Sequence, residues 1–518
     1  MSGVASRGPA TAKPTAARQT LAPRWDAAAL AVALLLFAGH VMLGANRTDL
    51  SLAFAMAWFI ALAVLTTRPW AEAALARARL LWPGAAFAAV LALAVLSLTP
   101  LAPGGVHAVW AWVGAPVKVG AIDPYATIVE LVKLAALAAA FLIGCSFGAD
   151  DDRARGLMRA VLQVGLVFSA WAFLDYVLNP NFLFGAARPF APDRLSGAFG
   201  SPNTAATCFG ALTLLNLVDV LRAYEGAGVG GRFYSSTLQR LLPRLARPLA
   251  GLALAATCLT LTQSRAGLAA AAAVAIVLAA VLALARAGQG GIRTPLIAIA
   301  AVALALVVGS AALNVDALQQ RFLFLHADAA LRSQIFAAHF AAFQAAPWGG
   351  YGLGSFARIN GMILSGSNLA ALQTIGAAHN VYIQWLEEAG VLGAAAMFAT
   401  VALIALQLAL GLARRRRMRP WLLAILAVLA LYLLHGASDY ALETPSMAAM
   451  LSLLLGLGAG IAGAAPVARA GAGRALGQDV DLGSAAAGPA PLQVGRYRTS
   501  GKVAQGLHAV RVSERDLS

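Results

Sequence analysis

Three short polar motifs interrupt an otherwise apolar chain, and their residue types could together bind an anion and move a proton. Ser264-Arg265 separates two apolar runs, Arg332 follows a third run, and His379-Asn380 precedes a fourth. Guanidinium groups bind diphosphate oxygens in bidentate fashion and stay charged at any working pH. A histidine with a pKa of about 6.5 can act as a base at neutral pH. The three motifs therefore suit the binding of an anionic headgroup and the removal of a proton from an acceptor hydroxyl.

Each motif also has a simpler interpretation. A lone Arg265 or Arg332 at the end of a membrane span often serves as a snorkelling anchor. His379-Asn380 could be a polar helix start, with Asn380 as the cap. The remaining polar residues near span ends are expected to be structural, solvated, paired within a span or interfacial: His326, His339 and His435, Glu130 with Lys133, and Glu387 with Glu388.

The composition indicates an integral membrane protein. Hydrophobic residues make up 60% of the chain and charged residues 12%, whereas a soluble domain has about 25% charged residues. Apolar runs long enough to cross a hydrocarbon core of about 30 Å recur along the chain. We expect an all-α protein with about twelve transmembrane helices, at 27–45, 51–67, 83–99, 126–147, 157–178, 203–221, 248–263, 266–286, 295–313, 386–411, 421–437 and 445–463.

The basic residues predict the topology, because Lys and Arg mark cytoplasmic loops. The net charge of +16 is therefore no indication of nucleic acid. With the N-terminus inside, the inside loops hold 22 Lys or Arg and the outside segments eight. The run Arg414–Arg417 with Arg419 is the strongest inside anchor. This arrangement puts residues 264–265, 314–380 and 436–444 on the same, outer face.

The chain divides into four parts. Residues 1–26 and 464–518 are predicted to be disordered cytoplasmic ends. Residues 27–178 are the N-terminal transmembrane helices, and residues 179–463 form a second membrane region with a large outside loop at 314–385. The three cysteines lie within spans and lack metal-site spacing, so we expect no metal and no cofactor.

Two outside loops contain residues that predict local structure. Residues 328–346 predict a short helix at the membrane interface that stops at Pro347, before a turn rich in glycine. The other loop, 179–202, carries Arg188 and Arg194 and ends in a Gly/Phe/Pro turn. Asn203 after this turn is predicted to cap the following span.

Arg265 can be placed by length alone. Residues 248–286 are apolar except for residues 262–265, and a single helix of this length would run about 58 Å, nearly two bilayer cores. The segment must therefore form two spans with a tight outside turn, in which Ser264 caps the second. Arg265 then lies beside the positive end of a helix dipole, which leads us to expect a bound anion.

As an ordered series these motifs resemble the O-antigen ligase and polymerase superfamily, over roughly residues 180–460. The series comprises Asn203 after its turn, Ser264-Arg265-Ala266-Gly267, the Arg332 helix ending at Pro347, Gly350-Tyr351-Gly352-Leu353-Gly354, and Ala378-His379-Asn380-Val381-Tyr382-Ile383-Gln384 followed by Glu388-Ala389-Gly390.

The resemblance implies a bacterial inner-membrane enzyme, active at the periplasmic face, that transfers a glycan from a polyprenyl-diphosphate carrier. The acceptor would be lipid A-core in a ligase or another glycan in a polymerase. By this resemblance Arg265 and Arg332 hold the diphosphate and His379 is the essential histidine. Asp439 could orient His379 or an acceptor hydroxyl. Other expected substrate contacts are Arg194, Asn203 and Asn380.

Three functions remain open at this point. A metal-independent ligase is our first expectation, and an O-antigen or exopolysaccharide polymerase with the same donor chemistry is a close second. A transporter or lipid-glycan flippase is the alternative from another class, although its ionisable groups should gather near the bilayer midplane.

Overall fold

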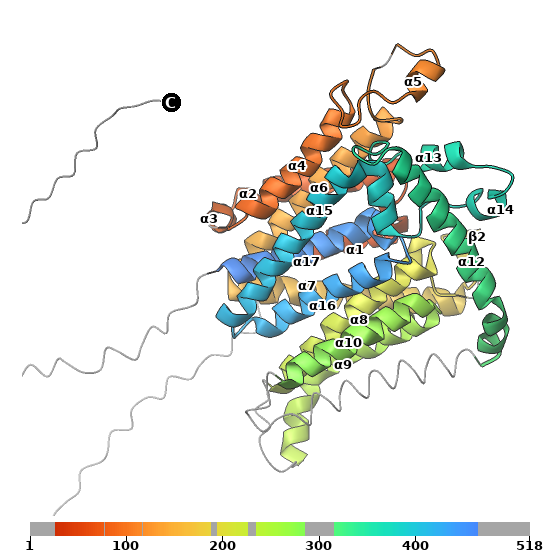
Figure 1. Ribbon diagram of the computed structural model, residues 1–518. Helices are drawn as coiled ribbons and strands as arrows, with labels where there is room; N and C mark the ends of the chain where they lie inside the picture. The colour runs from red at the N-terminus through yellow and green to blue at the C-terminus, as the bar shows by residue number, and fades with distance from the viewer. Residues whose placement is uncertain are drawn as a thin grey trace, which may run out of the picture. The chain divides into compact units, whose positions relative to one another are not determined.

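The structure, a computed structural model, describes residues 26–76, 78–116, 118–187, 194–225, 235–284 and 315–464 (Figure 1). These residues are helical apart from turns, loops and one short hairpin, β1 (Phe182–Leu183) with β2 (Ala186–Ala187). The predicted all-α class is therefore confirmed. The predicted terminal segments 1–26 and 464–518 lie outside the described residues, except for Asp26 and Ala464.

Eleven of the twelve predicted spans coincide with helices. These are α1 (Ala27–Val41), α2 (Thr48–Thr66), α4 (Leu81–Ser97), α6 (Pro124–Gly148), α7 (Asp151–Leu178), α8 (Pro202–Glu225), α9 (Ser235–Leu261), α10 (Arg265–Leu284), α15 (Val381–Arg414), α16 (Arg419–Gly436) and α17 (Pro445–Gly463). The span at 295–313 lies outside the described residues. Of the described helices, nine are long and apolar enough to cross a membrane, or ten if α3 (Pro69–Ala76) and α4 form one bent span. The count of twelve stays a prediction.

Helix starts follow from side-chain caps. Asp26, Asp123 and Asp150 accept hydrogen bonds from the first backbone N–H groups of α1, α6 and α7. The predicted cap at Asn203 is wrong. α8 begins at Pro202, and the Ser201 hydroxyl accepts the cap hydrogen bond from the Thr204 N–H at 3.4 Å. Proline suits the first helical position because it needs no backbone hydrogen bond there.

The helices pack around two centres. α8 is buried along its whole apolar span and lies against α9, α10 and α16 (Figure 1). α17 packs against α6, where Gly144 and Gly148 face Gly456 and Gly460. A Cβ on Gly456 would overlap the carbonyl oxygen of Phe141, so small residues allow these two backbones to touch.

The two ends of the helices differ in chemistry. The starts of α8, α10 and α15 and the turn after α16 carry residues predicted to act on the substrate. At the other end of α15, Arg415 pairs with Asp151, and the Arg153 guanidinium lies 4.0 Å from the ring centroid of Trp70. The basic run 414–417 and the candidate site thus lie at opposite ends of the same helices.

Between α10 and α15 the chain forms α12 (Val315–Ala345), α13 (Phe356–Ile363) and α14 (Leu369–Leu372). The predicted helix at 328–346 is confirmed in its end before Pro347, but it begins earlier, at Val315. The two short helices α13 and α14 follow it. α5 (Val109–Trp112) lies in the loop between α4 and α6.

Candidate functional site

The turn between α9 and α10 has the predicted form. α9 ends at Leu261 and α10 begins at Arg265. The Ser264 hydroxyl caps α10 by accepting a hydrogen bond from the Gly267 N–H at 3.3 Å. Gln263, just before it, has a left-handed backbone with φ of 53°. Such backbone is uncommon for a residue with a side chain and is found at tight functional turns. Arg265 is exposed at the first position of the helix.

His379 also has a left-handed backbone, with φ of 54°. The Asn380 side chain holds it there. Its carbonyl oxygen accepts from the N–H groups of Tyr382 and Ile383, and its amide donates to the carbonyl of Ala437 at 3.1 Å. Asn380 is thus the cap of α15, as the simpler interpretation predicted, and it ties the His379 loop to the end of α16.

The His379 imidazole is partly buried. Its ring meets Tyr440 edge-on, with centroids 4.9 Å apart, and Nδ1 is buried without a hydrogen-bond partner in the described structure. Burial and, to a lesser extent, the positive charge of Arg332 lower the pKa of His379 to about 4. The imidazole is therefore neutral well below pH 7, which corrects the expectation of an ordinary pKa of about 6.5.

Asp439 lies fully buried in the turn after α16. Neither carboxylate oxygen makes a hydrogen bond of standard geometry to a described residue, although the Asn203 amide and the Tyr440 N–H lie close by. Burial raises the pKa of Asp439 to about 6, while these neighbours and Arg332 oppose the rise. The ring beside His379 belongs to Tyr440, the next residue, so Asp439 faces Asn203 and Arg332 instead.

Arg332 joins these groups. It lies on α12 and is close enough to interact electrostatically with His379, His435 and Asp439. Four of the predicted site residues, Arg332, His379, Asp439 and Asn203, therefore converge. The remaining arginine, Arg194, is half-buried, and its neighbour Leu195 donates a backbone hydrogen bond to the carbonyl of Leu261 at 3.0 Å. This bond brings the loop of Arg194 to the α9–α10 turn.

His435 is a member of this site that the sequence did not suggest. Its Nδ1 lies 2.8 Å from the Thr207 hydroxyl of α8, and both side chains are buried. A Cβ built on Gly267 of α10 would lie 3.2 Å from its Cε1. The ring thus packs against the first turn of the helix that Arg265 begins.

A second polar contact positions Arg332. The His339 Nδ1 of α12 lies 2.8 Å from the Glu387 carboxylate of α15, and both side chains are fully buried. Arg332 and His339 are seven residues apart, about 10 Å along one face of a helix. Glu387 lies eight residues after His379. The His339–Glu387 contact therefore fixes the register of α12 that brings Arg332 near His379.

The expectation that Glu387 and Glu388 are merely interfacial is wrong. The Glu388 carboxylate is buried and accepts hydrogen bonds from the N–H groups of Gly354 and Phe356, at 2.6 Å and 3.2 Å. The predicted pairing of Glu130 with Lys133 is confirmed.

α15 is broken at Gly390, whose φ of 63° and ψ of −177° are open essentially only to glycine. At the break, backbone carbonyls lack hydrogen-bond donors within the helix. The glycine-rich segment 350–354 supplies these donors. The N–H groups of Tyr351 and Gly352 donate to the carbonyls of Glu387 and Glu388, at 2.9 Å and 2.8 Å. A Cβ on Gly390 would overlap the carbonyl of Trp348. We call this segment, Gly350–Gly354, the glycine plug. Its backbone hydrogen bonds to α15 hold the helix at its break.

The positive charge at this site comes from arginine side chains. Within the described ranges, no group of three or more His, Cys, Asp or Glu side chains is arranged to hold a metal ion.

Comparison with known proteins agrees with this arrangement. Residues 250–398 match the O-antigen ligase family. The matched range contains the α9–α10 turn, Arg332, the glycine plug and His379. No curated protein sequence matches the chain. This multi-pass membrane protein therefore contains, at residues 250–398, a region that matches the O-antigen ligase superfamily.

Proposed function

We propose that the protein transfers a glycan from a polyprenyl-diphosphate carrier to an acceptor hydroxyl at the periplasmic face of the inner membrane, as an O-antigen ligase. The observation that carries the proposal is that His379 and Asp439 both interact with Arg332, while the buried His379 Nδ1 has no described partner. Unpaired buried polar atoms are costly, which supports a polar ligand at this place.

In the proposed reaction the acceptor oxygen attacks the anomeric carbon of the donor, and the bond from that carbon to the diphosphate breaks. His379 takes the proton of the acceptor hydroxyl. Arg265 and Arg332 stabilise the charge of the departing diphosphate, which is greatest as the bond breaks. The donor's negative charge offsets that of Arg332, so donor binding makes His379 a stronger base.

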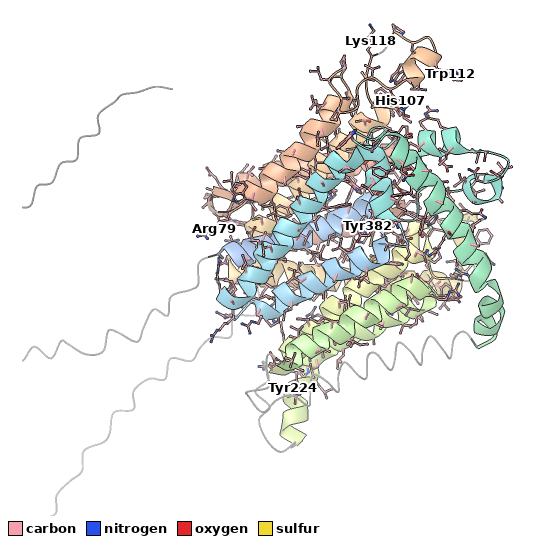
Figure 2. All side chains as sticks on the ribbon, in the orientation of Figure 1. Arg79, His107, Trp112, Lys118, Tyr224 and Tyr382 are labelled. Atoms are coloured by element: carbon pink, nitrogen blue, oxygen red, sulfur yellow. The ribbon has the colours of Figure 1, made fainter. Side chains whose placement is uncertain are left out.

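A cavity beside the site supports a lipid-linked substrate. It has a volume of about 660 Å³ and is lined mainly by apolar side chains of several helices, among them α15 from Val381 and Tyr382 to Ala405. Its lining also includes the charged residues Glu130, Lys133, Glu388 and Glu443. Tyr382, labelled in Figure 2, donates a hydrogen bond to the Leu433 carbonyl of α16 at 2.7 Å. The cavity thus begins within two residues of His379, as a lipid chain attached to a diphosphate would require.

Substitution of the arginines by lysine tests the diphosphate site, because lysine keeps the charge but loses the bidentate fork. We expect Arg265→Lys and Arg332→Lys each to lower transfer by about tenfold or more with purified protein and a lipid-linked donor. Arg358→Lys is the matched control, since Arg358 is exposed and pairs with Asp123 at 3.1 Å. Normal turnover in both site variants would mean that these arginines are only membrane anchors.

The acceptor is tested separately, by the surface glycans of a deletion strain. Loss of attached chains supports the ligase. Attachment of single repeating units in place of chains would instead identify a polymerase.

A further inference from the structure

His435 carries an unused hydrogen-bonding atom inside the site. Its side chain is buried at the end of α16, and Nε2 has no partner among the described residues. A buried donor or acceptor without a partner costs roughly 1–3 kcal/mol. The His379 Nδ1 is likewise buried without a described partner. The Asp439 carboxylate lies beside the Asn203 amide and the Tyr440 N–H. All three side chains interact electrostatically with Arg332, so they are grouped around the same positive charge.

The Thr207 contact fixes the ring. The hydroxyl of Thr207 has one proton to donate. Its contact with the Asn203 carbonyl is 3.4 Å, longer than an ordinary O–H···O bond, whereas its contact with His435 Nδ1 is 2.8 Å. The hydroxyl therefore donates to Nδ1. In a neutral imidazole the other nitrogen then carries the proton, so His435 has an Nε2–H that it can donate to a ligand.

The surroundings of His435 favour an anion as the acceptor of that N–H. The ring packs on the first turn of α10, where a Cβ on Gly267 would come within 3.2 Å of it. That turn begins with Arg265 and presents the positive end of the helix dipole. Arg332 adds a second positive charge that acts on His435.

We propose that His435 binds the donor by donating a hydrogen bond from Nε2–H to an oxygen of the diphosphate, in an orientation set by Thr207. This inference rests on the proposed function. It adds a ligand-contacting residue to the two arginines and assigns different tasks to the two histidines of the site. His379 moves a proton, whereas His435 holds the leaving group.

Binding of farnesyl diphosphate to the purified full-length protein in detergent, measured by calorimetry, tests the proposal. Farnesol is the probe that lacks the anion. We expect His435→Ala to weaken diphosphate binding about tenfold or more, since a hydrogen bond to a charged group is lost, and to leave farnesol binding unchanged. His435→Gln should stay within about threefold of the wild type, because its amide can donate from a similar position.

The orientation is tested on α8. Thr207→Val should weaken diphosphate binding by a smaller factor than His435→Ala, because the ring remains but its tautomer is no longer fixed. Thr213→Val is the matched control, since the buried Thr213 hydroxyl donates to the Phe209 carbonyl of its own helix at 2.7 Å. Thermal melting of each variant identifies a loss that comes from unfolding.

The outcomes separate the two proposals. If His435→Ala binds farnesyl diphosphate like the wild type while Arg332→Ala does not, the role of His435 is wrong and the arginine site stands. Equal losses in His435→Gln and His435→Ala, with both variants folded, would also overturn the donor role. If the arginine variants bind normally as well, the diphosphate site itself is wrong.

Discussion

The pH dependence of transfer tests the assignment of His379 as the base. The structure lowers the pKa of this histidine to about 4, first through burial and then through Arg332. At pH 5.5 an imidazole with that pKa is only about 3% protonated, whereas one with a pKa of about 6.5 is about 90% protonated. A base must be neutral to accept a proton. At pH 5.5 a pKa of about 4 therefore predicts nearly full activity, whereas a pKa of about 6.5 predicts about a tenth of the activity.

The quantity to measure is kcat/KM, which reports the ionisation of the free enzyme. We expect its acid limb to fall near pH 4 in a purified assay with a lipid-linked donor. The limb of kcat should lie at higher pH, because a bound diphosphate offsets the Arg332 charge that lowers the pKa. His379→Ala gives the baseline, and we expect its turnover to be lower by about 10²–10⁴ at pH 7.

Asp439 is the neighbouring group that could imitate this result, because its pKa is raised to about 6. If the acid limb of the kcat/KM profile lies near pH 6 and disappears in Asp439→Asn, this limb reports the ionisation of that carboxylate. A limb near pH 6.5 that persists in Asp439→Asn would show that His379 is solvated, and would refute the reasoning from burial. Turnover of His379→Ala at a tenth of the wild type or more would rule out its role as base.

Three further measurements test the fold and its orientation. Gly390→Ala should destabilise the protein by at least about 1–3 kcal/mol, because its backbone is open only to glycine, and thermal melting should show it; Gly361→Ala, with open space around its Cβ, is the control expected to melt like the wild type. With a membrane-impermeant thiol reagent on intact spheroplasts, Ser367→Cys should be labelled and Arg417→Cys should not; the reverse pattern would invert the topology. EDTA should leave transfer unchanged, and a loss restored by a divalent cation would show that a metal takes part.

Local features of the sequence were sufficient for the helices and for part of the site. Apolar run length predicted the two helices on either side of Ser264-Arg265, because no single helix of that length fits a bilayer. The polar start of α15 at Asn380 was equally visible. The prediction of a cap at Asn203 was wrong because α8 begins one residue earlier, at Pro202. The capping residue is therefore Ser201.

The remaining features depend on contacts between distant segments. His435 looked like an ordinary residue at a helix end, since its partner Thr207 lies 228 residues away. Glu387 looked interfacial because nothing near it in the sequence indicates His339, which lies 48 residues earlier on another helix. The pKa of His379 likewise follows from burial and from the approach of Arg332, and neither is encoded in the residues beside it.

The break in α15 also has a consequence for the order in which the protein is made. The glycine plug precedes α15 in the chain, so ribosomes complete it first. When α15 enters the bilayer, the carbonyls of Glu387 and Glu388 need hydrogen-bond donors that lipid cannot supply. The donors on Tyr351 and Gly352 have by then been synthesised, so the break can close as soon as the helix inserts. A circular permutant that produced α15 before the plug would insert this helix with its break unsatisfied, and it should assemble more slowly than the natural order.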